Sequence, residues 1–347
     1  MSDAAGDQMS SERPVRVPAT ARRNAFVVGA GAAAGLLYSS VALALFSLLP
    51  IQLTYGRRGR REGALAALTA FLVAAAVQAL RLLAAGSVGL AAIGAGALPP
   101  LVLFAALAAI NARFWEGVPA TFRVLATSAA CALAGLPALV ALLRDGGFSE
   151  FFAAQLGQAL EPLRQQAGVQ VGDGGYESSV IAAALDPKAL AESALRIFTS
   201  CYAGIIALIV GASAWAGNRL AGPGSRGREA SPPLSAYRAP YALLWIFLGC
   251  WTILLAALLA KVPGTYRAAA WNIAILSSLP YAAQGAGIAL SLFSRWKLPR
   301  FMRVALIATA VMALFTPTAG VVVAVGLPLL GVTEVWIPYR NPKGVGA

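Results

Sequence analysis

One apolar stretch of the chain carries most of the polar side chains that could bind a ligand. We predict a ligand site from five of its residues: Trp271, Asn272, Tyr281, Gln284 and Gly285. Tyr281 and Gln284 are spaced i and i+3, so they share a helix face, whereas Asn272 does not lie close to that face. Such a pair can hydrogen-bond a neutral or zwitterionic molecule, and the preceding Pro280 is typical of broken helices that line transport sites. The alternative is that both side chains bond a neighbouring helix.

Residues for catalysis or metal binding are scarce. The chain has no histidine, which removes the commonest metal ligand and the usual general base near neutral pH. Cys131, Cys201 and Cys250 each lie alone in an apolar run, which favours a role as small core residues. No phosphate loop of the Walker type, zinc-protease motif or haem attachment site is present. We therefore expect no catalytic residues, no metal, no cofactor and no enzymatic activity.

Helices that cross a membrane must position these residues. Eight stretches of eighteen or more residues lack Asp, Glu, Lys and Arg: 24–56, 63–80, 82–112, 124–143, 197–218, 239–260, 268–294 and 304–333. A helix of about 20 apolar residues crosses a hydrocarbon core of about 30 Å. With 59% hydrophobic and 12% charged residues, the sequence predicts an all-α polytopic integral membrane helix bundle of about 8 to 10 spans, some short or broken.

Basic residues collect in the gaps between these runs. There are four basic gaps. The first contains Arg57, Arg58, Arg60 and Arg61, and the other three are residues 113–123, 219–238 and 295–303. Two apolar runs separate each gap from the next, and basic loops stay on the cytoplasmic side. We therefore expect all four gaps on the cytoplasmic side of a bacterial inner membrane. The formal charge of +13 then indicates the lipid bilayer as partner, and not nucleic acid.

The chain divides into five predicted segments. They are a disordered basic cytoplasmic N-terminus (1–23), a first half of membrane helices (24–143), an acidic extracytoplasmic segment (144–196), a second half of membrane helices (197–333) and a C-terminal tail (334–347). In the acidic segment, apolar residues recur at helical spacing from Phe148 to Leu160. This spacing predicts an amphipathic helix on or near the outer surface.

The first and last apolar runs each allow two interpretations. Residues 24–56 are too few for two full spans, so they form a hairpin of short helices turning near Ser39 and Ser40, or one basic flank is translocated. We favour the hairpin. In residues 304–333, Pro317 and Pro328 can break one long helix into two short ones, which would return the C-terminus to the cytoplasmic side.

Four local patterns, taken in order, resemble the YybS-like family of bacterial membrane proteins, a family known chiefly as a domain of unknown function. They are Leu49-Pro50-Ile51 leading through the arginine loop to Gly63, Asn218-Arg219-Leu220 with Tyr237-Arg238-Ala239-Pro240, Tyr281 to Gly285, and Leu330 to Glu334 with Arg340. The resemblance covers residues 25–342. Glu334 stands where aspartate is more usual, and residues 145–195 carry no motif of the family. The resemblance implies structural or topological roles for Asn218, Arg238, Pro240, Glu334 and Arg340.

That family is distantly similar to the S components of energy-coupling-factor transporters and to the cell-shape protein MreD. The first likeness implies a small-molecule-binding or transport-related subunit with a coupling or ATPase partner, docked through Gly31 and Gly35, whose spacing lets helices approach closely. We favour this first function; the second likeness implies the alternative, a non-transporting scaffold of envelope or division machinery. A pocket lined by Asn272, Tyr281 and Gln284 would favour transport, and side chains filling that space would favour the scaffold.

Overall fold

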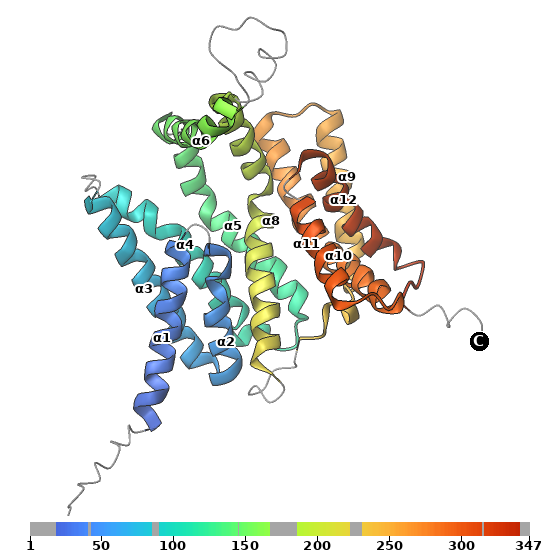
Figure 1. Cartoon of the computed structure of the whole chain (residues 1–347), viewed down its shortest axis with the longest axis horizontal. Helices are drawn as coiled ribbons and strands as arrows, with labels where there is room; N and C mark the ends of the chain where they lie inside the picture. The colour runs from blue at the N-terminus through green and yellow to red at the C-terminus, as the bar shows by residue number, and fades with distance from the viewer. Residues whose placement is uncertain are drawn as a thin grey trace, which may run out of the picture.

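A computed structural model describes residues 19–40, 43–84, 90–144, 146–166, 186–222, 231–313 and 316–340, and all regular elements in these ranges are helical (Figure 1). The helices are α1 (Ala19–Ser39), α2 (Leu48–Arg58), α3 (Arg60–Ala84), α4 (Leu90–Ile110), α5 (Ala120–Arg144), α6 (Gly146–Gln166), α8 (Pro187–Ala221), α9 (Ala242–Leu259), α10 (Gly264–Arg295), α11 (Arg300–Ala313) and α12 (Pro317–Thr333). Three short 3-10 helices lie at Ala44–Phe46 (η1), Arg113–Trp115 (η2) and Leu234–Ala236 (η3).

Five of the described helices are long and apolar enough to cross a membrane, namely α3, α5, α8, α9 and α10. Three shorter apolar helices cover residues 24–39, 96–110 and 319–333. Each of the eight predicted apolar runs overlaps one of these eight helices. The prediction of an all-α polytopic membrane bundle with some short spans is therefore confirmed.

The first and last runs both fold as two helices. The first turns after Ser39, where α1 ends, and returns through η1 and α2, so the predicted hairpin is confirmed. The Arg81 Nη2 donates to the Ser39 carbonyl (2.8 Å) and satisfies this helix end. The last run breaks at Pro317, which begins α12, whereas Pro328 is accommodated inside that helix.

The four basic gaps lie on one side of the bundle, as side-chain contacts between them show. The contacts are Arg60 with Glu116 (2.8 Å), Arg57 with the Leu220 carbonyl (3.3 Å), Thr121 with Tyr237 (3.0 Å) and Arg340 with the Ser235 carbonyl (2.8 Å). A bond from Arg295 to the Tyr339 carbonyl (2.9 Å) adds the fourth gap. The C-terminal segment thus returns to the side of the 219–238 gap.

Residues 146–166, where the sequence predicts an amphipathic helix, form α6, which lies at the opposite end of the bundle from the α8–α9 linker (Figure 1). Two predicted boundaries differ from the structure. Helix α8 begins at Pro187, capped by the Asp186 carboxylate, and runs through residue 196 without a break. Helix α1 begins at Ala19, inside the segment predicted to be disordered. Residues 1–18, 167–185 and 341–347 lie outside the described ranges.

The bundle has two main apolar cores. The first joins α1 to α4 with α8 and includes Leu107 and Val210. The second joins α9, α10 and α12 and includes Phe247 and Tyr281. Helix α5 contacts both, since Val124 packs against the first core and Phe122 against the second. The ligand residues predicted from the sequence belong to the second half.

Candidate functional site

The predicted site lies where α10 crosses α12. A Cβ atom at Gly285 would overlap the Leu327 carbonyl, and one at Gly331 would overlap the Tyr281 carbonyl. The two glycines therefore let the helix backbones touch, as small residues do in membrane bundles. Gly285 leaves room for a neighbouring helix, and not for a ligand.

Gln284 uses its whole side-chain amide within the chain. Its Oε1 accepts from the Ala239 N–H (2.7 Å), just before α9 begins. Its Nε2 donates to the Gly331 carbonyl (3.0 Å) and to Glu334 Oε2 (2.9 Å). The residue is 5% exposed. Gln284 thus ties α10 to the end of α12 and to the entry of α9, and the amide has no N–H left for another molecule.

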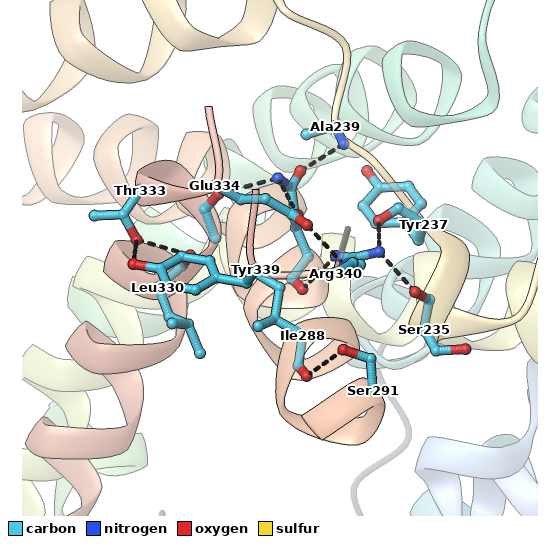
Figure 2. A network of polar contacts seen from close by, with 12 residues as sticks. Ser235, Tyr237, Ala239, Ile288, Ser291, Leu330, Thr333, Glu334, Tyr339 and Arg340 are labelled. Atoms are coloured by element: carbon cyan, nitrogen blue, oxygen red, sulfur yellow. Dashed lines mark hydrogen bonds and ion pairs between the residues drawn. The ribbon is translucent and has the colours of Figure 1, made fainter. Parts of the chain in front are cut away.

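Glu334 and Arg340 form a buried ion pair beside this amide (Figure 2). The Arg340 Nε lies 2.9 Å from Glu334 Oε1, and the side chains are 9% and 5% exposed. These two atoms form no hydrogen bond besides the ion pair. Removing one member of such a pair leaves an uncompensated buried charge, which is far more costly than losing both. The Glu334 carboxylate is therefore paired with Arg340.

Arg340 also satisfies backbone carbonyls of the α8–α9 linker (Figure 2). Its Nη1 donates to the carbonyls of Ser235 and Tyr237 (both 2.8 Å), and its Nη2 donates to the Gln284 carbonyl (3.0 Å). Burial lowers the pKa of the Arg340 guanidinium, the Glu334 carboxylate raises it, and Arg238 lowers it. Burial likewise raises the pKa of Tyr237, against a hydrogen bond with Thr121. One arginine thus holds the chain end against the linker.

Tyr281 packs in the second core without a polar partner. It is 1% exposed, and its ring meets the Phe247 ring edge to face at 5.2 Å between centroids. Its hydroxyl is buried and makes no hydrogen bond to the described residues. An unpaired buried hydroxyl costs about 1–3 kcal/mol. Of the predicted ligand residues, Tyr281 is therefore the one whose polar group is buried without a hydrogen bond to the described residues.

Asn272 and Trp271 lie apart from this network and bond other elements. The Asn272 Nδ2 donates to the Thr199 carbonyl (2.6 Å) of α8, and its Oδ1 accepts from the Ala203 N–H (2.8 Å) of the same helix. Trp271 meets the Trp251 ring edge to face at 6.3 Å. The structure therefore does not bring Asn272 together with Tyr281 and Gln284.

A second polar cluster, Gln52 with Asn111 and Asn218, joins α2, the end of α4 and α8. The Gln52 Nε2 donates to Asn218 Oδ1 (2.6 Å), and Asn111 Nδ2 donates to Gln52 Oε1 (2.8 Å). Gln52 and Asn111 are fully or almost fully buried. Sequence reasoning included Asn218 but missed Gln52 and Asn111, although each is an amide inside an apolar run, the same signal that identified Gln284.

The other predicted residues make structural contacts. Arg58 lies over the Phe26 ring at 5.2 Å, while Arg61 and Arg238 are exposed. The Pro240 carbonyl accepts from the Leu243 N–H (3.0 Å) in the first turn of α9. Gly31 and Gly35 face α3 closely enough that a Cβ at either would crowd a carbonyl of that helix. This face thus packs within the chain, and docking on a coupling subunit stays a prediction.

Among the described residues, no group of three potential metal ligands gathers. A cavity of about 150 Å³ lies on the other side of the molecule, between α6 and α8, where Ser149, Glu150, Ala153, Lys188 and Glu192 line it. It contains none of the predicted ligand residues. The α10–α12 network is thus chemically suited to holding segments together, through buried charge and amide groups that are already paired.

The model of a family described as "Predicted membrane protein (DUF2232)" matches residues 33–328. No curated protein and no solved structure matches the chain.

Proposed function

The chain belongs to the DUF2232 family of predicted membrane proteins, and we propose that it is a non-transporting membrane scaffold. The observation that carries this proposal is the engagement of Gln284, whose amide groups all bond to other parts of the chain. A residue that binds a transported molecule needs free donors or acceptors facing a cavity. Here Gln284 and Gly285 face α12 and the entry of α9.

Paired amides also account for Asn272. Its side chain bonds the carbonyl of Thr199 and the N–H of Ala203, one turn apart on α8. Polar residues of membrane bundles join helices in this way without binding ligands. Both of the predicted amide ligands therefore act as links between helices, which favours a rigid bundle that presents surfaces to other proteins.

The resemblances also suggest a specific family, membrane and set of partners for such a scaffold. We propose that the family is the YybS-like one, that the chain lies in the bacterial inner membrane, and that its architecture is closer in role to MreD than to S components. Its partners would then be proteins of the envelope or division machinery. We propose no catalytic reaction, because the chain lacks histidine and the buried carboxylate of Glu334 is paired with Arg340.

One observation favours the alternative, a small-molecule-binding subunit similar to S components. The Tyr281 hydroxyl is buried without a partner, next to Pro280 inside α10. A polar ligand that reached this point would satisfy it. A scaffold can also tolerate the cost of a buried, unpaired hydroxyl. A substitution of Tyr281 therefore distinguishes the two functions best.

The test compares the wild-type chain with Tyr281→Phe in lipid nanodiscs over a metabolite panel. If the chain is a scaffold, no metabolite should stabilise wild type selectively. A selective metabolite would raise the melting temperature of wild type but not that of Tyr281→Phe. The scaffold function further predicts that envelope or division proteins co-purify with the tagged chain. Stabilisation that requires the Tyr281 hydroxyl, together with recovery of ATPase subunits, would establish the transport reading instead.

A further inference from the structure

The chain builds one helix-entry turn three times, before α5, before α10 and before α11. Residues 117–123, 261–267 and 297–303 share a pattern: a residue of positive φ, an aliphatic residue, a proline and, four residues after the proline, an arginine. In the turns before α5 and α11, the arginine Nε donates to the carbonyl of the aliphatic residue, at 2.6 Å for Arg123 and 2.8 Å for Arg303. These two turns therefore form a matched pair in which the surroundings can be compared.

The helices that follow the two turns have different neighbours. Val124, the residue after the first arginine, packs against the first core. Its counterpart Val304 is 65% exposed, and Ile307, one turn later, is 44% exposed. In α11, every residue whose side chain the structure describes is exposed except Arg303 and Ala313. The helix face that packs against the first core in α5 is therefore exposed at the equivalent positions of α11.

The two turns also differ in charge balance. In the first, Glu116 pairs with Arg60 at 2.8 Å. The second holds Arg295, Lys297, Arg300 and Arg303, and the sequence has no Asp or Glu between Glu229 and Glu334. Glu334 is already paired with Arg340. The cations of the second turn therefore lack a nearby countercharge from their own stretch of chain.

The position of the second turn indicates where the missing anion would lie. The turn follows the end of α10, a helix long and apolar enough to cross a membrane, so it stands at the edge of the hydrocarbon region. Trp296 and Phe301 flank it at 65% and 81% exposure, and exposed aromatic residues of this kind mark the headgroup level, as tryptophan does most strongly. The cations thus lie at the depth of lipid phosphates, with the open apolar face of α11 directly beside them.

We propose that the α10–α11 turn and α11 bind a phospholipid with an anionic headgroup. Lys297 and Arg300, both exposed, contact the headgroup, and the acyl chains lie along Val304 and Ile307. Charge complementarity selects this occupant, because cations beside the membrane surface attract anionic lipids. A second copy of the chain would place identical cations against one another. The proposal does not depend on the scaffold function.

Trp296 offers a built-in reporter for the experiment. Nanodiscs of phosphatidylcholine are prepared with a minor fraction of brominated phosphatidylglycerol or, in parallel, of brominated phosphatidylcholine. The difference in quenching between wild type and Trp296→Phe isolates the Trp296 signal. We expect brominated phosphatidylglycerol to quench Trp296 more strongly, and Lys297→Gln/Arg300→Gln to lower its apparent affinity by about fivefold for each cation removed.

The control variant is Arg61→Gln/Arg113→Gln, which removes the same charge from exposed positions on the same side. It should keep the excess quenching by phosphatidylglycerol. Equal quenching by the two brominated lipids, or an equal loss in the control variant, would overturn the proposal. So would binding of a decaglutamate peptide to the turn without any preference for phosphatidylglycerol, because the surface would then fit an acidic protein segment.

Discussion

The two buried polar clusters of this molecule connect different kinds of backbone. In the neutral cluster, the amides of Gln52, Asn111 and Asn218 bond mainly to one another and hold α2, α8 and the end of α4 together. In the charged cluster, Gln284 and Arg340 bond to an N–H and to carbonyls of the segment before α9, and Glu334 bonds to both of these side chains. Regular helices satisfy their own backbone in the membrane, whereas irregular segments do not.

This difference explains why charge appears in one cluster only. The linker before α9 leaves the carbonyls of Ser235 and Tyr237 without helical partners, and a guanidinium can satisfy several carbonyls from one position. Arg340 does so, and Glu334 balances its charge. The neutral cluster joins helices that need only a cross-link. The charged cluster thus holds the linker before α9 in place, whereas the neutral cluster holds α2, α8 and the end of α4 together.

The largest expected effect comes from leaving one charge of the charged cluster unpaired. Arg340→Met should destabilise the chain by about 3–5 kcal/mol, because the Glu334 carboxylate stays buried without its partner. Adding Glu334→Gln should recover much of that loss, since the uncompensated charge is then gone. Reversible unfolding in mixed micelles measures both. A single variant no less stable than the double one would show that the pair is not buried.

A smaller effect is expected from widening the crossing of α10 and α12. Gly285→Ala should cost about 1–3 kcal/mol, as overpacking in a filled core does, because the new methyl group overlaps the Leu327 carbonyl. Gly326→Ala is the matched control in α12, where a Cβ meets nothing within 4 Å. Thermal unfolding followed by helix signal compares the two. Equal effects would mean that the helices do not touch at Gly285.

The neutral cluster should be the more tolerant of the two. Gln52→Leu removes its central amide, and hydrogen bonds between membrane helices contribute only about 0.6 kcal/mol on average. We therefore expect a loss well below that of Arg340→Met in the same unfolding assay. If Gln52→Leu proved as damaging as Arg340→Met, charge would not be what distinguishes the clusters.

The smallest effect concerns the surface pair of Arg60 and Glu116. The hydrogen bond and charge of Arg60 lower the pKa of the Glu116 carboxyl below its ordinary value. A lowered pKa stabilises the folded state above the ordinary pKa, and this contribution is lost as the pH falls through the folded-state value. Glu116→Gln should leave the melting temperature near pH 7 almost unchanged and flatten its decline in acid. An unchanged acid profile would indicate that the pair does not form in solution.

Sequence patterns predicted much of the fold because apolar length and basic gaps are local signals. Each of the eight apolar runs overlaps an apolar helix, and the turn after Ser39 and the break at Pro317 follow from helix length and proline geometry. The extent of α8 was missed because the acidic residues around Glu192 fall on a helix that continues beyond the apolar run.

The site was predicted only in part. Tyr281, Gln284, Glu334 and Arg340 are polar residues at apolar runs, and the structure does gather the last three. The hydrogen-bond partners of Gln284 and Arg340 could not be predicted, because they include backbone groups at positions 235 to 239, far away in sequence. The partner of Asn272 on α8 is likewise distant in sequence and could not be predicted. Composition shows that a buried amide needs a partner, but only the packing of distant segments decides which one.

Access of water to α10 tests most directly whether this region is filled by the chain itself. In a variant with all three cysteines replaced by alanine, Ile288→Cys places a thiol at a fully buried position one turn from Gln284, and Arg300→Cys places one in the exposed α10–α11 turn. A water-soluble maleimide in membrane vesicles should label Cys at 300 readily and Cys at 288 hardly at all. Rapid labelling at 288 that a metabolite suppresses would contradict the packed network and reveal a binding cavity.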